Sequence, residues 1–431
     1  MPQRTVNFVV ITALFAFSLT SCLKVEHPSP AAKSNAEPQA GEVAVVIPAA
    51  EPAGDVIPET GLTAEEIEAG WIALFDGHSL YGWKSGNDVN WHVEQGVIKA
   101  DSGKPGLLLT TSPFADYELK FDFRLTPETN SGVFLRTVFD PKDPAKDCYE
   151  LNLCDQKTEY PTGSLVGRSK IQEPIPASQE WQSFTVRLEG SQIQASHNGK
   201  EVLNFKDTSD HLRKIGFIGL QKNEGAVEFR KIYLKPLRMS TIFNGVDLAG
   251  WRVVPGSQST FEVVDETIHV TAEKQGYLET EETWDNFLFQ AMAKSNGTAL
   301  NSGYFFRAIK GTESGLANGY EVQIHNGIKE NDRTRPENAG TGAIFRRTEA
   351  RRVVSNDHEW FTTTLSAYGS HIAVWINGYQ VTDWEDTRKP DENPRKGLRL
   401  KAGHISLQGH DPTTDLNFKN LKVSTLPAET P

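Results

Sequence analysis

Apolar and polar residues alternate one by one along most of the chain beyond residue 70, which is the pattern of β-strands. The stretch 116–125, DYELKFDFRL, shows this period of two, and 371–384, HIAVWINGYQVTDW, alternates or runs apolar over strand lengths. Asn198-Gly199 and Asn377-Gly378 interrupt such stretches, and Asn-Gly favours a two-residue hairpin turn because both positions need positive φ. No long segment shows the period of a helix. The pattern predicts short antiparallel strands packed as a two-sheet sandwich or jelly roll.

One alternating stretch, YEVQIHN at 320–326, carries side chains that are suited to catalysis. Successive side chains of a strand point to opposite faces, so one face is apolar and belongs to a core. The opposite face carries Glu321, Gln323 and His325. That face is either solvated or the floor of a concave site, and we favour the concave site.

Six sequence blocks occur twice in the same order, which indicates a duplicated domain. LFDGHSLYGW at 74–83 returns as IFNGVDLAGW at 242–251, and NSGVFLR at 130–136 returns as NSGYFFR at 301–307. The other four pairs begin at residues 149 and 320, 161 and 340, 180 and 359, and 218 and 405. Each copy has the length of a domain. We expect a first copy over residues 63–238 and a second over residues 239–431.

The beginning of the chain predicts an export signal over residues 1–22. Arg4 precedes an apolar run from Val6 to Leu19, which is short for a membrane span. The run ends in LTSC at Cys22, which resembles a bacterial lipobox and implies a lipid on that cysteine; a secretory signal with a chance cysteine is the alternative. The resemblance implies an exported lipoprotein, anchored by its lipid to a membrane in the periplasm or at the outer membrane.

Residues 23–62 are rich in Pro, Ala, Glu and Ser, so they predict a disordered tether. Thr63 followed by Glu66 can form a capping box, where the folded part should begin. Cys148 and Cys154 lie six residues apart on one predicted strand, roughly 20 Å from each other, which is too far for a disulfide. We expect two free thiols.

The net charge and the residue composition limit the classes of ligand that the protein is expected to bind. The formal charge of -12 and the absence of a dense Lys/Arg block argue against nucleic acid as a partner, and neutral or cationic ligands fit such a charge better. No tight spacing of His, Cys, Asp and Glu indicates a metal site. The cofactor is unknown, and a divalent metal remains an open alternative.

The repeated motifs resemble the 3-keto-disaccharide hydrolase domain family. The resemblance rests on the LF-x-G-x-x-L-x-GW opening, NSG-x-F-x-R, YE-x-Q-I, TGA and the closing LQ-x-H, and it covers nearly all of the chain after Trp71, twice. It implies an all-β fold of two tandem concanavalin-like jelly-roll β-sandwich domains. It also implies activity on carbohydrate partners, namely glycosides or disaccharides whose sugar carries a ketone at C3.

Such a ketone acidifies the neighbouring C2 hydrogen, so a base can remove it and the C1 oxygen can leave by elimination. The route needs a base, a cation at the developing enolate oxygen and an acid for the leaving oxygen. In the second copy we predict Glu321 as base, Arg307 as the enolate's cation, and His410 or His325 as acid. Predicted substrate contacts there are an aromatic platform, Phe305, with Gln323, Gln408 and Asn301. In the first copy they are Phe134, Arg136, Glu150, Asn152, Asp155 and Gln221.

Each copy departs from the family's motifs. The first has Asn152 for Gln and Asn223 for the LQ-x-H histidine, and the second has Asn326 where the family often has an acid. Because His410 keeps a proton carrier near neutral pH, we predict that the second copy is active and that the first copy binds substrate. In the alternative without a functional site, Glu321 and Arg307 form an ion pair on a solvated sheet. The protein is then a carbohydrate-binding lipoprotein or an envelope scaffold.

Overall fold

The computed structural model describes residues 53–154, 156, 158–315 and 318–428. The export signal with Cys22, most of the predicted tether, and Asp155 lie outside the described residues. Among the helices that the structure describes, none is long and apolar enough to cross a membrane.

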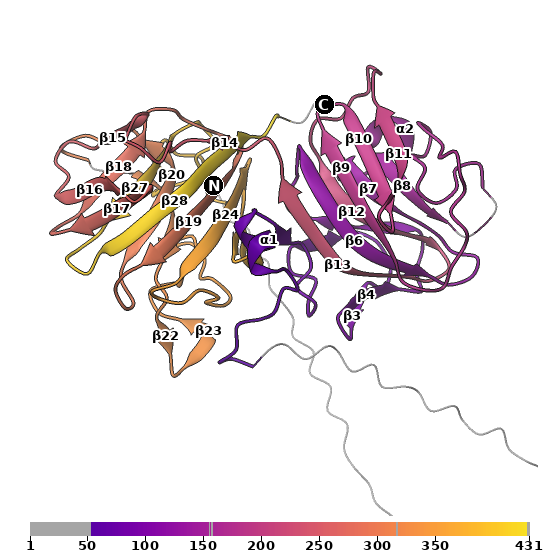
Figure 1. Ribbon diagram of the computed structural model, residues 1–431, viewed down its shortest axis with the longest axis horizontal. Coiled ribbons are helices and arrows are strands. Elements are labelled where there is room, and N and C mark those ends of the chain that lie inside the picture. The colour runs from indigo at the N-terminus through magenta and orange to yellow at the C-terminus, as the bar shows by residue number, and fades with distance from the viewer. Residues whose placement is uncertain (1–52, 155, 157, 316–317, 429–431) are drawn as a thin grey trace, which may run out of the picture. The chain divides into compact units, whose positions relative to one another are not determined.

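The first copy forms a β-sandwich, drawn from indigo to magenta in Figure 1. Its strands are β1 (Ile72–Ala73), β2 (Trp83–Ser85), β3 (His92–Glu94), β4 (Val97–Ala100), β5 (Gly106–Thr110), β6 (Tyr117–Leu125), β7 (Asn130–Thr137), β8 (Tyr149–Cys154), β9 (Gln182–Glu189), β10 (Gln192–His197), β11 (Lys200–Lys206), β12 (Phe217–Glu224) and β13 (Val227–Pro236). One sheet has eight strands in the order β11-β10-β9-β6-β13-β4-β3, with β1 also paired to β13. The other has five, in the order β2-β5-β12-β7-β8.

The second copy repeats this topology. Its strands are β14 (Ser240–Thr241), β15 (Trp251–Val253), β16 (Ser259–Val264), β17 (Thr267–Ala272), β18 (Gly276–Thr280), β19 (Phe287–Ser295), β20 (Ser302–Ile309), β21 (Asn318–Ile324), β24 (Trp360–Tyr368), β25 (His371–Ile376), β26 (Tyr379–Glu385), β27 (His404–Gly409) and β28 (Asp415–Thr425), with an added hairpin of β22 (Ile328–Lys329) and β23 (Asp332–Pro336). The sheet orders are β16-β17-β28-β19-β24-β25-β26, with β14 beside β28, and β15-β18-β27-β20-β21. The predicted pair of all-β jelly-roll sandwiches is confirmed.

The alternating pattern explains the large sheets. Along β6 every second side chain is buried, and the inward residues join the aromatic core of the first sandwich. Both predicted Asn-Gly turns form hairpins, because Asn198 and Asn377 adopt φ values of 45° and 49° and the glycines after them also have positive φ. Two short helices complete the described residues, α1 (Ala64–Glu68) and α2 (Pro144–Asp147). The capping box of α1 on Thr63 is present as predicted.

The five-stranded sheet of the second copy is buried on both faces along β18, β20, β21 and β27. Along β21, Tyr320, Val322 and Ile324 point into the core of the second sandwich, as predicted. The opposite face of the same sheet carries a separate small apolar cluster of Val254, Tyr277, Phe305 and Ala308. In the first copy, β8 is likewise buried along its length, and its Cys148 and Cys154 are free thiols, as expected. On the outer face of the second copy's sheet, the polar side chains of Glu321, Gln323 and Gln408 are therefore shielded from water.

Candidate functional site

Strand pairing gathers the polar side chains of the second copy on the outer face of its five-stranded sheet. Glu321 on β21 lies opposite Phe305 on β20, because the two residues are partners in the antiparallel register. Gln408 on β27 lies opposite Tyr277 on β18. Side chains of directly opposed residues share a face, so the acid, the amide and the two aromatic rings form one cluster.

Glu321 is a buried carboxyl group with an altered acidity. Its side chain is 5% exposed, and this burial raises its pKa, although the positive charges of Arg395, His410 and Arg346 act in the opposite direction. Arg395 donates a hydrogen bond from Nη2 to Oε2 of Glu321 over 3.2 Å. The net result is a carboxyl that is harder to ionise than an exposed glutamate, which suits a general base near neutral pH.

Arg395 also covers the aromatic ring of the cluster. Its guanidinium lies 5.2 Å from the centroid of the Phe305 ring, and Tyr277 meets the same ring edge-on at 5.0 Å. Phe305 is therefore fully buried. The predicted sugar platform is not open, because these two side chains occupy the space above it.

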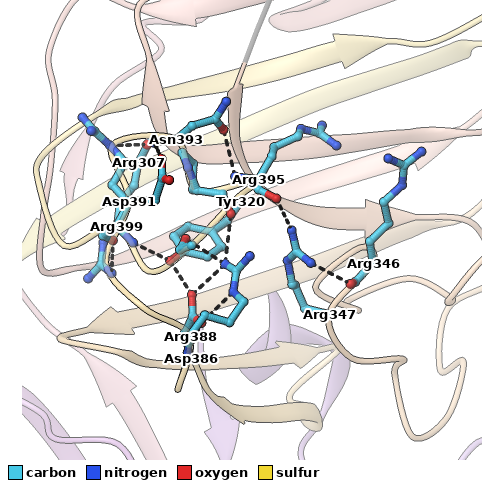
Figure 2. A network of polar contacts seen from close by, with 12 residues as sticks. Arg307, Tyr320, Arg346, Arg347, Asp386, Arg388, Asp391, Asn393, Arg395 and Arg399 are labelled. Atoms are coloured by element: carbon cyan, nitrogen blue, oxygen red, sulfur yellow. Dashed lines mark hydrogen bonds and ion pairs between the residues drawn. The ribbon is translucent and has the colours of Figure 1, made fainter.

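The segment 386–399, which connects β26 to β27, supplies Arg395. Tyr320 donates from its hydroxyl to Asp386 at the start of the segment over 2.7 Å, and the backbone N–H of Arg399 at its end donates to the same hydroxyl over 2.9 Å (Figure 2). The first copy makes the same two contacts with Tyr149, Asp207 and Arg213. The segment has fourteen residues in the second copy and seven in the first, 207–213, so Arg395 lies in the added length.

A chain of polar groups continues from this cluster to His410. Gln323 donates to Asn301 over 3.2 Å, and the Asn301 amide nitrogen lies 3.2 Å from Nδ1 of His410. Nδ1 also lies 2.7 Å from a carboxylate oxygen of Asp411, and a carboxylate only accepts, so this contact requires the proton on Nδ1. The Asn301 amide nitrogen is then a neighbour of Nδ1 and not its hydrogen-bond partner, since both groups are donors. Asp411 thereby fixes the orientation of the imidazole and leaves Nε2 for another partner.

Two buried amide oxygens on this face have no hydrogen-bond partner among the described residues, Oε1 of Gln323 and Oε1 of Gln408. Their amide nitrogens are engaged, since Gln408 donates to the Tyr277 hydroxyl over 3.1 Å and Gln323 donates to Asn301. A buried acceptor without a donor costs about 1–3 kcal/mol. Sugar hydroxyl groups are donors of the kind that these oxygens lack.

Arg307 makes none of its side-chain hydrogen bonds with Glu321, so the ion pair of the alternative interpretation is not formed and the predicted enolate cation does not lie beside the base. A shift in the register of β20 follows Phe306, and Arg307 adopts φ 45°, which turns its side chain out of the strand's alternation. The guanidinium is fully buried and donates to the backbone carbonyls of Asp285, Gly369 and Arg399 over 2.7–3.1 Å. Arg136 makes the equivalent carbonyl contacts in the first copy. Both arginines hold loops together rather than a substrate.

His325 also lies apart from the cluster, at the end of β21. Burial lowers the pKa of its imidazole, and the acidic groups that act on it are Glu337 and Asp357 rather than Glu321. Among the described residues no group of three His, Cys, Asp or Glu side chains is arranged to hold a metal ion.

The first copy has a simpler version of the same face. Glu150 lies opposite Phe134, as Glu321 lies opposite Phe305. Burial raises the pKa of Glu150 to about 7, and the only opposing influence is a hydrogen bond from the Gln221 side chain. The side-chain amide of Asn152 donates its hydrogen bond to the backbone carbonyl of Tyr160. No arginine acts on this carboxyl.

A cavity of about 570 Å³ lies over the sheet of the first copy, and Phe134 and Gln221 are among the residues that line it. Leu107 stands there at the position of Tyr277, opposite Gln221 in the register. The aromatic ring of this copy therefore borders open space, although its side chain is only 4% exposed.

Family comparison agrees with the duplicated site. Residues 70–235 and residues 238–424 each match the model of the 3-keto-alpha-glucoside-1,2-lyase-like domain. The chain belongs to this family. Its two copies of the domain each carry the opposed phenylalanine and glutamate described above.

A 3-keto-disaccharide hydrolase of Bacteroides thetaiotaomicron is 32% identical over 77 residues, which are 15% of this chain and 27% of that relative. The chain thus matches about a quarter of the relative's length. Among solved structures, a Parabacteroides distasonis protein assigned to the glycosyl hydrolases is 21% identical, with a TM-score of 0.37 over 41% of this chain and 98% of that one. A carbohydrate-binding module from Bacillus subtilis is 16% identical, with a TM-score of 0.29 over 36% of this chain and 95% of that one.

Sequence reasoning identified Glu321, Gln323, Gln408, Asn301 and His410, which the structure brings together. It missed Arg395, Tyr277 and Asp411. No sequence pattern marks Tyr277, because GYLET at 276–280 does not alternate; its place beside the strand of the closing LQ-x-H motif comes from the sheet order. Arg395 has no counterpart in the first copy, so the repeat gave no sign of it.

Proposed function

We propose that the second copy cleaves glycosides whose sugar carries a ketone at C3, with Glu321 as the general base. The observation that carries the proposal is a buried carboxyl of raised pKa that lies 3.2 Å from a guanidinium on the same sheet face. The 3-keto substrate follows the family and the Bacteroides relative. Arg395 takes the role that the sequence gave to Arg307.

The reaction can be written with this chain's groups. Glu321 takes the proton from C2, and the electron pair of the C–H bond forms an enolate with its charge on the C3 oxygen, where Arg395 stabilises it. The enolate re-forms the ketone, a C1–C2 double bond appears, and the C1–O bond breaks with its electron pair on the leaving oxygen. His410, as an imidazolium whose Nδ1 proton is held by Asp411, donates its Nε2 proton to that oxygen. Water then adds across the double bond, which completes a net hydrolysis.

Binding of a hydroxyl-bearing ring fits the rest of the site. The acceptors on Gln323 and Gln408 can take hydroxyl protons of the sugar. Covering the site with substrate removes water from Glu321 and strengthens every electrostatic contact of the enolate.

A second function, carbohydrate binding without catalysis, fits the first copy. The observation that favours it is the cavity beside Phe134 and Gln221, combined with a carboxyl that has no cation to stabilise an enolate. The first copy would then hold part of a glycan while the second copy acts on it.

The test compares Glu321→Gln with its matched control Glu150→Gln on a 4-nitrophenyl 3-keto-glucoside, with and without added divalent metal. Loss of the base should lower kcat at position 321 by a factor on the order of 100 to 10,000 with KM little changed, and the change at position 150 should cost much less. Equal small losses, or a larger loss at position 150, would place the chemistry elsewhere. No turnover by the parent protein would remove the enzyme proposal.

A further inference from the structure

We infer that the second-copy site takes an acidic saccharide, with its carboxylate or sulfate bound between Arg346 and Arg395. The inference rests on the proposed function, because it concerns the substrate class of the same site. It also reverses the expectation of neutral or cationic ligands, which came from the charge of the whole chain.

Charge near the site differs from the charge of the chain. The segment 386–399 carries five Lys and Arg and three Asp and Glu, whereas the whole protein has a formal charge of -12. Its acids are already engaged. Asp386 pairs with Arg388 over 2.8 Å, and Glu392 pairs with Arg399 and Lys401 over 3.1 and 2.6 Å.

Arg346 adds a guanidinium that has no carboxylate partner among the ion pairs of the described residues. It is exposed, and its only contact of note is with the ring of Phe345, 5.4 Å away. Arg346 adopts φ 62°, and Gly167 stands at the matching position of the first copy with φ 71°. A side chain in this left-handed conformation costs about 1–2 kcal/mol, which glycine avoids. The second copy therefore keeps a charged side chain where its backbone disfavours one.

Arg347 links the backbone at Arg346 to the backbone at Arg395. Its Nη1 donates to the backbone oxygen of Arg346 over 3.2 Å, and its Nη2 donates to the backbone oxygen of Arg395 over 2.7 Å, as Figure 2 shows. Arg388 holds the same turn through the carbonyls of Pro394 and Gly397, each over 2.9 Å. The backbone from which both side chains extend is therefore held in place before a ligand arrives, which lowers the entropic cost of binding.

Both guanidinium groups act at the reacting carboxyl. Arg346 and Arg395 each lower the pKa of Glu321, so each lies within electrostatic reach of that group. On the same sheet face, the amide oxygens of Gln323 and Gln408 need hydroxyl donors. A ligand that carries hydroxyl groups beside an anionic group is an acidic sugar. A guanidinium binds carboxylate and sulfate oxygens through paired N–H groups.

The test is calorimetric titration of the full chain with three unoxidised probes: 4-nitrophenyl β-D-glucuronide, 4-nitrophenyl β-D-glucoside 6-sulfate and the neutral 4-nitrophenyl β-D-glucoside. At least one acidic probe should bind about tenfold more tightly than the neutral one. Arg346→Gln should reduce this preference to about twofold or less. Lys206→Gln, which removes a charge from an exposed strand of the first copy, should leave it unchanged.

Comparison of the two acidic probes shows whether the site prefers a carboxylate or a sulfate. Equal affinity for all three probes, no binding of either acidic probe, or a preference that survives Arg346→Gln would each overturn the inference. These probes cannot undergo elimination, so the result is independent of turnover. A protein that cleaves 3-keto-glucosides but shows no preference for acidic probes would keep the proposed function and lose only this inference.

Discussion

Arg395 and Glu321 lie 74 residues apart in the sequence and are joined by a hydrogen bond of 3.2 Å. The pair separates the two copies chemically, because the corresponding carboxyl of the first copy, Glu150, has no cation acting on it. In the second copy the arginine lowers the pKa of Glu321, and in the proposed reaction it stabilises the enolate oxygen.

Arg395→Gln should alter both rate and pH dependence. Arg395 lowers the pKa of Glu321, so its removal lets that pKa rise further, and the base is then ionised only at higher pH. The acidic limb of the kcat/KM profile should move to higher pH, and kcat on the plateau should fall on the order of 100-fold through loss of the enolate's partner. Lys396→Gln, its exposed neighbour, is the control. A profile that keeps its acidic limb in place would contradict the role given to Arg395.

Glu150→Gln should stabilise the protein at high pH. The folded-state pKa of about 7 exceeds the ordinary value of 4.5, so the folded state favours the protonated carboxyl, and stability is lost as pH rises through 7. Glutamine removes this loss. Urea unfolding should show a gain of up to about 3 kcal/mol at pH 8 and almost none at pH 4. Exposed Glu201→Gln should show no such pH-dependent gain, and a gain equal at both pH values would refute the explanation.

Arg307→Met should weaken the fold of the second copy rather than its chemistry specifically. The substitution leaves the carbonyls of Asp285, Gly369 and Arg399 without their buried donor, which should cost about 3–5 kcal/mol. Thermal unfolding measures the loss. Arg335→Gln, which breaks a half-exposed ion pair, should cost less than about 1 kcal/mol. Normal stability with lost turnover would restore Arg307 to the catalytic site.

Cys22→Ser tests the proposed lipid anchor. Leu23 and Lys24 follow the cysteine, and an acidic retention signal is missing there, so we propose anchorage to an outer membrane. Membrane fractionation should find the parent with the membranes and the serine variant in the soluble fraction. Ser34→Ala, in the predicted tether, should behave as the parent does. Equal membrane association of parent and Cys22→Ser would end the proposal.

Much of the fold could be predicted from the sequence, because apolar residues at every second position mark the side chains of a strand that are buried. In β6 and in the two Asn-Gly hairpins, the residue pattern and the local backbone requirement agree, so strands and turns could be predicted together. The repeated blocks then fixed the number of sandwiches. The same alternation placed Glu321 and Gln323 on one face of β21.

The alternation of side chains gave a wrong prediction where the backbone departs from regular strand geometry. Arg307 is two residues after Phe305, which suggests a shared face, but the register shift and its positive φ send the side chain into a network of carbonyls. Arg395 lies in an irregular segment without periodicity, and its contact with Glu321 depends on tertiary folding alone. The one sequence signal was the unequal length of the two segments, 386–399 and 207–213.

These two unequal segments begin and end on the same anchors, a tyrosine hydroxyl that holds both an aspartate and an arginine backbone N–H. Everything between the anchors can change without altering the sheets, so the segment is an exchangeable module of the fold. Duplication thus gave this protein two β-sandwiches, each with one such anchored segment. The length of that segment decides whether an arginine lies beside the glutamate of the same sandwich. Exchange of the segments would move the arginine from one copy to the other and leave the sheets as they are.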